Sequence, residues 1–382
     1  MGFIHALQGL IDWLGWYILP LIAVLSLIVF IHELGHYLVG RWCGVTIVAF
    51  SLGFGPELFA RVDRRGTRWR IGALPLGGYV KFLGDEGIAS AANPGEVAQL
   101  PEADRRRTLA GQPVANRAAI VAAGPIANFL LAIVLFAGIY AAFGKNIHAP
   151  IIGAVVPGSA ADHGGFLAGD VVKTVDGSPV ESFDDMHDMI TLKTGIEMSF
   201  GVQRGGQELT LYAAPALTIV HGPLGDGRMG QLGIASTNKP EDFKNISCSL
   251  PTCFVWGAQQ TGQVVKSTFA YVKGLFGGRE SVDQVGGLIA VAQIAGAIAK
   301  ISLLELFGLA AIFSVSVGMM NLLPVPLLDG GHLMYYAYEA IRGRPLSQKV
   351  QEFGLRIGIA LVAILVIFST GHDLFRLFGH SN

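Results

Sequence analysis

The sequence predicts a polytopic α-helical membrane protein with four transmembrane helices and a β-rich domain outside the membrane. Of the 382 residues, 52% are apolar and only 14% are charged, and the mean hydropathy is +0.51. That composition lies well above the hydropathy of ordinary soluble domains. Four windows are long and apolar enough to cross about 30 Å of hydrocarbon at about 1.5 Å per helical residue. A further region alternates apolar segments with Gly, Pro and Asp turns, which is typical of short strands.

The four predicted spans cover residues 17–38, 118–143, 303–328 and 353–377. Lys and Arg concentrate in cytoplasmic loops, so the flanking charges predict the orientation of the chain. Residues 1–40, which hold the first span, contain no Lys or Arg, whereas residues 41–117 contain eleven. We therefore expect a periplasmic amino terminus and a cytoplasmic 41–117 region. The last two spans, within 303–382, are joined by a second basic turn.

A fifth apolar run, residues 286–299, is too short to span the membrane. Fourteen residues reach only about 21 Å as a helix. We expect this run to lie at the membrane interface, inside a periplasmic linker of residues 216–302.

The cytoplasmic region divides into two parts of different composition. Residues 47–83 predict short strands, since β-branched and aromatic residues alternate there with Gly-rich turns. Residues 84–113 are rich in Ala, Ser, Pro, Glu and Asp, which predicts a flexible loop.

The region outside the membrane contains a compact β-rich pattern over residues 151–215, with one helical stretch at 184–192. Its central segment, GGFLAGDVVKTVDGSPV, resembles a PDZ domain. PDZ domains recognise extended peptides by adding them as a strand beside their sheet. The alternative is a small β-domain that binds nothing.

The chain has three cysteines. With this topology Cys43 is cytoplasmic and reduced, whereas Cys248 and Cys253 lie in an oxidising compartment where they could pair. Their spacing alone favours two free or merely packed thiols and leaves the pairing open.

The first span ends in the motif HELGH, residues 32–36. His32 and His36 are four residues apart, so on a helix they share one face and can hold a metal ion between them. Glu33 can reach a water on that metal without being a ligand. Zinc lowers the pKa of such a water to roughly 7, and a carboxylate beside it can accept the proton and later protonate the leaving amine. Ionisable side chains are costly inside an apolar segment, which favours this interpretation over chance or simple packing of histidines.

A catalytic zinc ion usually has three protein ligands, so a third must be found. Glu57 lies about twenty residues beyond His36, the distance at which many soluble zinc proteases place a glutamate, but it falls in the predicted strands. Asp329 closes the third apolar window, where a metal would offset the charge of its carboxylate. We favour Asp329. His332 is a weaker candidate, better suited to supporting a ligand or to packing.

The same window carries two prolines that interrupt its helix. Pro324 and Pro326 remove backbone donors and leave carbonyl groups that neighbours, water or a bound peptide must satisfy. Asn321 adds a polar side chain at similar depth. The alternative is a plain kink.

Five motifs in this order resemble those of a known family: HELGH at 32–36, GFGP at 53–56, LPLGGYVK at 74–81, GPIANFLLA at 124–132 and NLLPVPLLDGGH at 321–332. With the PDZ-like segment, they resemble the site-2 proteases, and specifically the bacterial branch that carries out regulated intramembrane proteolysis of anti-sigma factors. Many relatives have two PDZ domains where this sequence shows one. The segment GGLIAVAQIAG also departs from the family's pattern before the third span.

The resemblance implies a set of site residues and a setting for them. It implies that Zn²⁺ is bound by His32, His36 and Asp329, that Glu33 is the catalytic base, and that Asn321, Pro324 and Pro326 handle substrate. Residues 47–83 would form a membrane-associated β-loop that engages unwound substrate. The active site would face the cytoplasmic side of the bacterial inner membrane.

The implied partners are single-pass transmembrane protein substrates, membrane lipid and an upstream periplasmic protease, with the PDZ domain acting as a size filter. A net charge of −1 gives no reason to expect nucleic acid as a partner. One alternative is a non-enzymatic PDZ-bearing scaffold with a structural metal, which Glu33 disfavours because such a site needs no base. A metal transporter is another, and it would place more polar residues within the spans.

Overall fold

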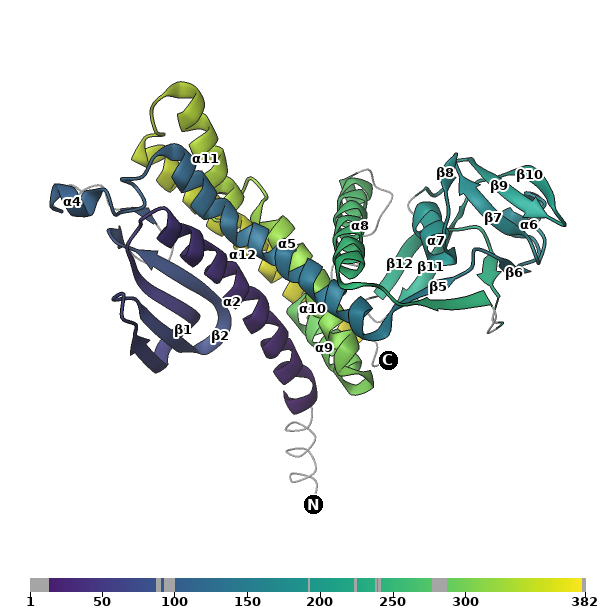
Figure 1. Ribbon diagram of the computed structural model, residues 1–382, viewed down its shortest axis with the longest axis horizontal. Helices are drawn as coiled ribbons and strands as arrows, with labels where there is room; N and C mark the ends of the chain where they lie inside the picture. The colour runs from purple at the N-terminus through teal and green to yellow at the C-terminus, as the bar shows by residue number, and fades with distance from the viewer. Residues whose placement is uncertain are drawn as a thin grey trace, which may run out of the picture. The chain divides into compact units, whose positions relative to one another are not determined.

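The computed structural model describes residues 14–86, 91–92, 100–191, 193–222, 225–237, 239, 242–276 and 287–379. The chain divides into two compact units (Figure 1). The first comprises Met1–Phe136, Gly257–Val265 and Gly287–Asn382, and the second comprises Ala137–Trp256 and Lys266–Gly286. The predicted site residues all belong to the first unit.

Four helices in the described part of the chain are long and apolar enough to cross a membrane: Gly15–Trp42, Val114–Phe143, Leu303–Asn321 and Gln348–Gly371. The first span combines η1 (Leu14–Ile18) with α2 (Leu19–Trp42). The others belong to α5 (Val114–Phe143), α10 (Leu303–Asn321) and α12 (Gln348–Gly379), and Figure 1 labels α2, α5, α10 and α12. They agree in number and order with the predicted spans, and they fit a membrane protein.

The third predicted window, 303–328, was too long at its carboxyl end. Helix α10 ends at Asn321, and a new helix, α11 (Asp329–Arg342), begins at Asp329. Pro324 and Pro326 lie between the two helices, where they lack the amide hydrogens that a continuous helix would need. Asp329 therefore occupies the first turn of a separate helix.

The short apolar run forms helix α9 (Leu288–Ile301), which is too short to span, as expected. Its small residues Ala292 and Ala295 are buried against Leu21 of α2 and Leu309 of α10. The carboxylate of Asp373, on α12, accepts hydrogen bonds from the backbone N–H groups of Gly287, Ile289 and Ala290 at the start of α9. Such a carboxylate compensates the unpaired donors of a helix amino terminus.

The 47–83 region forms strands, as predicted, but they make one long hairpin and not a set of short strands. Strand β1 (Ile47–Val62) pairs antiparallel with β2 (Arg68–Phe82), with several register shifts. Of the glycines expected in turns, only Gly66 lies in the hairpin turn, and Gly53, Gly55, Gly72, Gly77 and Gly78 lie inside the strands. Gly53, for example, has φ +86° and stands so close to the Leu74 carbonyl that a Cβ there would lie 2.7 Å from its oxygen, a typical setting for a β-bulge.

The predicted flexible loop contains short regular elements: β3 (Asp85–Glu86), β4 (Ala91–Ala92) and α4 (Glu102–Arg105). Strands β3 and β4 pair antiparallel. Residues 87–90 and 93–99 of the predicted loop lie outside the described residues.

The second unit holds the β-rich segment. Its four-stranded sheet has the order β10-β9-β7-β8, and the strands are β7 (Val171–Val175), β8 (Ser178–Pro179), β9 (Met198–Arg204) and β10 (Gln207–Ala213). Two short helices, α6 (Ala160–His163) and α7 (Phe183–Thr191), contribute to its core, in which Phe166, Val172, Met186 and Phe200 are fully buried.

The expected linker, residues 216–302, contains regular structure in its described residues. Strand β11 (Ala216–Gly222) pairs with β12 (Gly225–Gln231), and β14 (Phe243–Ile246) pairs with β5 (Lys145–His148). Strand β13 (Ile234–Ser236) pairs antiparallel with β6 (Ile152–Val155), so the β-rich body continues beyond residue 215.

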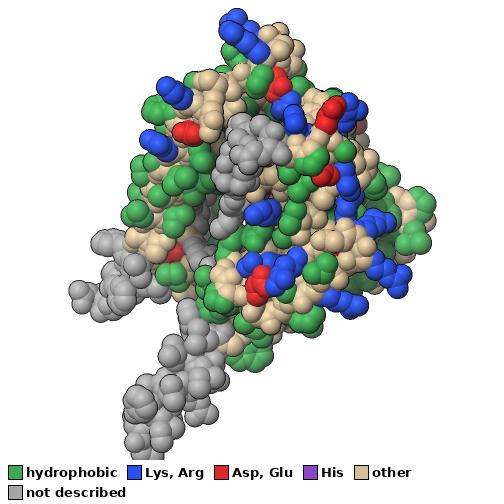
Figure 2. Space-filling model, turned by 90° about the vertical axis from the view of Figure 1, so that its left-hand side faces the viewer, with side chains coloured by type: hydrophobic (Ala, Val, Ile, Leu, Met, Phe, Trp, Pro, Cys, Tyr) green, Lys and Arg blue, Asp and Glu red, His purple; other side chains and the backbone are tan. Residues whose placement is uncertain are grey.

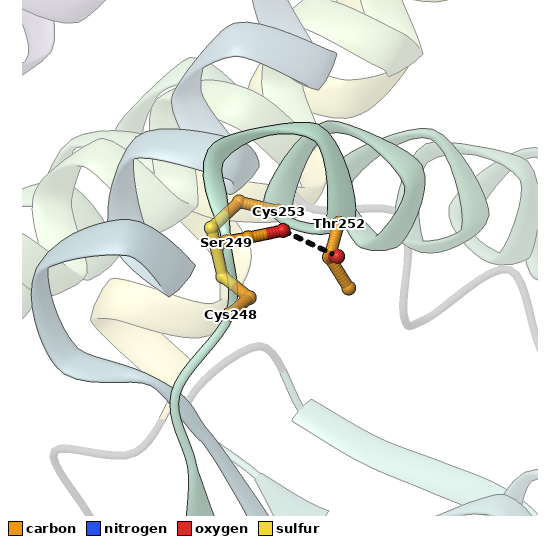
Figure 3. Close-up of a disulfide and its surroundings, with 4 residues drawn as sticks. All are labelled: Cys248, Ser249, Thr252 and Cys253. Carbon is orange, nitrogen blue, oxygen red and sulfur yellow. Dashed lines mark hydrogen bonds between the residues drawn. A yellow bond between two sulfur atoms is a disulfide. The ribbon is translucent and has the colours of Figure 1, made fainter.

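Cys248 and Cys253 form a disulfide at the start of helix α8 (Leu250–Phe276), as Figure 3 shows. The preference for two unpaired thiols was therefore wrong. The first turn of α8 folds the chain back so that the two Cα atoms lie 5.4 Å apart, well within bonding range. Spacing along the sequence could not show that a helix begins between the two residues.

Candidate metal centre

Three predicted ligand atoms meet at one point in the first unit. His32 and His36 lie one turn apart on α2, and Asp329 reaches them from the first turn of α11. The Oδ2 atom of Asp329 is 3.2 Å from His32 Nε2 and 3.6 Å from His36 Nε2, and the two Nε2 atoms are 3.2 Å apart.

These separations suit a tetrahedral metal ion. Ligand atoms bound at about 2.0–2.1 Å to one tetrahedral ion lie about 3.3 Å from each other. Two imidazole nitrogens and a carboxylate oxygen are also a donor set that zinc accepts, with one position left open. The residues present therefore fit a catalytic zinc ion.

Glu33 lies beside this trio on the wall of a cavity of about 200 Å³. Strand β2 passes beside Glu33. Gly78 on this strand is so close to Glu33 that a Cβ added to the glycine would lie 3.1 Å from Glu33 Cγ. Other lining residues come from α5, from the end of α10, from the segment before α11 and from α11 itself, and they include Ile120, Val121, Asn321, Leu328, His332 and Tyr336. The cavity thus has a possible base and three possible ligands on one side and an irregular strand on another.

The remaining predicted residues have different surroundings. Asn321 lines the cavity. Pro324 and Pro326 do not line it, although they belong to the segment that leads to Asp329. His332 lines the cavity but is not part of the trio.

The alternative third ligand, Glu57, is engaged elsewhere. On the β1–β2 hairpin its carboxylate accepts hydrogen bonds from Arg68, the shorter of them 2.5 Å, and lies 3.1 Å from Arg70 Nη1. The hydrogen bond from Arg68 lowers the pKa of Glu57 below its usual value. This arrangement favours Asp329 as the third ligand.

Sequence reasoning did not anticipate the contribution of α5. The backbone carbonyl of Ile120 accepts a hydrogen bond from His36 Nδ1 at 2.8 Å, and the Asn128 amide lies 3.3 Å from His32 Nδ1. Asn128 lies in the GPIANFLLA motif, which was the available signal, and Ile120 lies one helical turn before that motif.

Comparison with known proteins identifies the chain. A sequence profile described as peptidase family M50 matches residues 20–365. The chain belongs to peptidase family M50. It is 43% identical to a protein of Agrobacterium fabrum that is named as a zinc metalloprotease, over 98% of this chain and 100% of that one. It is 37% identical to metalloprotease MmpA of Caulobacter vibrioides, over 94% of this chain and 95% of that one.

The predicted enzyme class is therefore confirmed, since M50 members are metal-dependent proteases. This M50 protein is a hydrolase with four apolar helices that fit a membrane. Part of it is similar to the PDZ domain of an SdrC-like protein from Listeria innocua, with 18% identity, a TM-score of 0.20 and coverage of 24% of this chain and 96% of that one.

Proposed function

We propose that this M50 protein cleaves peptide bonds inside the transmembrane segments of single-pass membrane proteins, in regulated intramembrane proteolysis. The observation that supports this most strongly is the depth of the candidate metal centre. Two of the proposed ligands and the proposed base stand on α2, an apolar helix of membrane-spanning length. A site built there meets substrates that are themselves in the membrane, such as a membrane-anchored anti-sigma factor.

Each polar residue of the centre has a role in the proposed reaction. His32, His36 and Asp329 would hold zinc, which when bound acidifies water and polarises a carbonyl group. Glu33 would accept a proton from the attacking water and then deliver it to the nitrogen of the leaving amine. Asn321 would contact the substrate from the end of α10.

The substrate must be extended before it can be cut. Peptide bonds inside a helix are shielded by the helix's own hydrogen bonds, and within lipid the freed groups need new partners. Gly78 on β2 lines the cavity and has no side chain to cover its backbone. A substrate strand pairing there would satisfy its backbone as in other strand-addition complexes. The prolines 324 and 326 would leave further backbone carbonyls for the same purpose.

The orientation we propose has a periplasmic amino terminus in the bacterial inner membrane and an active site towards the cytoplasm. Figure 2 shows the side of the first unit that carries the hairpin, where Lys and Arg side chains stand among hydrophobic ones. Such a surface suits the cytoplasmic face of a membrane with anionic lipid. The Cys248–Cys253 disulfide supports an oxidising compartment for the second unit.

The periplasmic unit would act as a PDZ-type size filter that admits substrates already shortened by another protease. Because β13 pairs with β6, the deletion that tests this must remove residues 151–236 together. We expect the shortened enzyme to cut full-length substrate. Unchanged selectivity would contradict the filter.

The central experiment combines metal analysis with cleavage of a transmembrane reporter by purified protein in lipid vesicles. Wild type should hold one zinc ion and cleave. Glu33→Gln should keep the zinc and lose cleavage, and Asp329→Ala should lose both. Glu57→Ala serves as the matched control and should retain both. Cleavage by Glu33→Gln at the wild-type rate would refute the role of Glu33 as the base. Absence of cleavage by the zinc-loaded wild type would refute the proposed function and leave the scaffold alternative.

A further inference from the structure

Asn128 is a buried polar residue in an apolar helix of the first unit, and packing alone does not explain it. It lies in the middle of α5, within a predicted membrane span, and its side chain is completely buried. Burying an amide without partners costs free energy, and the cost is greater in lipid. A polar side chain at such a costly position usually has a functional role.

The hydrogen bonds of Asn128 divide between its backbone and its side chain. Its backbone carbonyl accepts a hydrogen bond of 2.8 Å from Ser314 Oγ, which ties α5 to α10. Its side-chain Nδ2 lies 3.3 Å from His32 Nδ1. Among the described residues, the side-chain Oδ1 has no hydrogen-bond partner although it is buried. The helix contact therefore does not need the side chain, and His32 is the side chain's only described polar partner.

The metal site determines which nitrogen of His32 carries the proton. A neutral imidazole has one N–H, and a nitrogen that binds metal must be the one without it. His32 Nε2 points to Asp329 and His36, so Nδ1 must be the N–H donor when zinc is held. The group facing Nδ1 must then be an acceptor. His36 already meets this condition, because its Nδ1 faces the carbonyl of Ile120.

Asn128 can meet the same condition by a half-turn of its amide about the Cβ–Cγ bond. That rotation exchanges Oδ1 and Nδ2, which have nearly the same size. Oδ1 then accepts from His32 Nδ1, and the orphaned acceptor gains a partner. In the metal-free protein the opposite orientation lets Nδ2 donate to Nδ1 while His32 Nε2 donates to Asp329.

We propose that Asn128 is a positioning residue that holds His32 in the tautomer required for zinc binding, by accepting a hydrogen bond from Nδ1. This inference rests on the proposed zinc-dependent function. It assigns α5 a common task, because Ile120 and Asn128 lie eight residues apart on one face of the helix and each supports one of the two histidines. Partners of this kind on metal-bound histidines typically strengthen metal affinity by 10- to 100-fold.

Zinc affinity, measured by chelator competition in the full-length purified protein, tests the assignment. Asn128→Leu and Asn128→Ala should bind zinc about 10- to 100-fold more weakly than wild type. Asn128→Asp keeps an acceptor oxygen opposite Nδ1 and should stay within a few-fold of wild type. Ser314→Ala is the matched control, since it removes the bond to the Asn128 backbone and leaves the side chain in place; its affinity should match wild type.

Thermal unfolding of the metal-free proteins separates positioning from plain structural support. Leucine removes the whole amide group, including the buried Oδ1 that has no partner. Metal-free Asn128→Leu should therefore be at least as stable as wild type. If Asn128→Leu binds zinc within threefold of wild type, or if Asn128→Asp binds as weakly as Asn128→Leu, the role of Asn128 is refuted. Should the Asp variant fail to fold, Asn128→Leu alone decides. Wild-type protein that binds no zinc would instead refute the proposed function.

Discussion

Arg117 and Glu339 form an ion pair that joins the first turn of α5 to the last turn of α11. The Arg117 Nη2 to Glu339 Oε1 distance is 2.6 Å, and both side chains are largely buried. The Arg117 guanidinium also lies over the ring of Tyr336, 5.0 Å from its centroid. Helix α11 begins with Asp329, the proposed third ligand. Helix α5 contacts the two histidines. The ion pair therefore holds the helix that carries the third ligand against the helix that contacts the other two.

Removing one partner of this ion pair should destabilise the first unit. Breaking a buried pair leaves an unpaired charge and typically costs about 3–5 kcal/mol. We expect Glu339→Ala to lower the free energy of unfolding by about 3 kcal/mol in a denaturant titration and to weaken zinc binding. The matched control is Glu102→Ala, because the Glu102–Arg106 pair is exposed and should contribute less than about 1 kcal/mol. Equal effects of the two variants would contradict the prediction.

Asp85, in β3 just after the β1–β2 hairpin, should make stability depend on pH. Burial raises its pKa to about 7, and the hydrogen bond from the Phe82 backbone N–H offsets this only in part. The folded protein therefore keeps the proton up to about pH 7, whereas the unfolded chain releases it near pH 4. Stability should be greatest below about pH 4 and should fall as pH rises through 7, by up to about 4 kcal/mol for this group.

The measurement compares thermal unfolding of wild type and Asp85→Asn at pH 5 and pH 8. The neutral amide has no proton to lose, so the variant should gain stability over wild type at pH 8 and differ less at pH 5. Asp162→Asn, at an exposed position of the second unit, is a suitable control. An advantage of Asp85→Asn that is the same at both pH values would show that Asp85 does not titrate in this range.

The three cysteines should report the topology of the chain. With the proposed orientation, a membrane-impermeant maleimide added to intact cells should label Cys248 and Cys253 only after reduction, because they are paired. Cys43, a free and partly exposed thiol, should be labelled only when the membrane is permeabilised. Single-cysteine variants assign each signal. Labelling of Cys43 in intact cells would reverse the proposed orientation.

The sequence was most informative where the immediate neighbours of a residue in the chain explain its chemistry. The spacing of His32 and His36 on a helix placed both on one face, and the cost of charge in an apolar segment pointed to Asp329. The sequence was less informative about where elements end, since α10 stops at Asn321 and the glycines of the hairpin mark bulges. The support given by α5 depends on contacts between residues 84 and 96 positions apart, which no local pattern specifies.

Gly124 illustrates such a contact and yields the last prediction. It lies on α5 between Ile120 and Asn128, and a Cβ at this position would lie 2.3 Å from His36 Nε2 and 2.8 Å from His32 Cε1. Real Cβ atoms do not approach so closely, so Gly124→Ala must displace either α5 or the two imidazoles. Because zinc tolerates deviations of only about 0.2 Å in its ligand distances, we expect this variant to lose zinc and protease activity.

The same helix offers a matched control for Gly124→Ala. Gly138 has no atoms within 4 Å of its hypothetical Cβ. Since alanine favours helix over glycine by about 1 kcal/mol, Gly138→Ala should keep its zinc and activity and be slightly more stable. Zinc content by mass spectrometry and reporter cleavage measure both variants. Full zinc content in Gly124→Ala would mean that α5 can retreat from the histidines, and that its close approach is not required for metal binding.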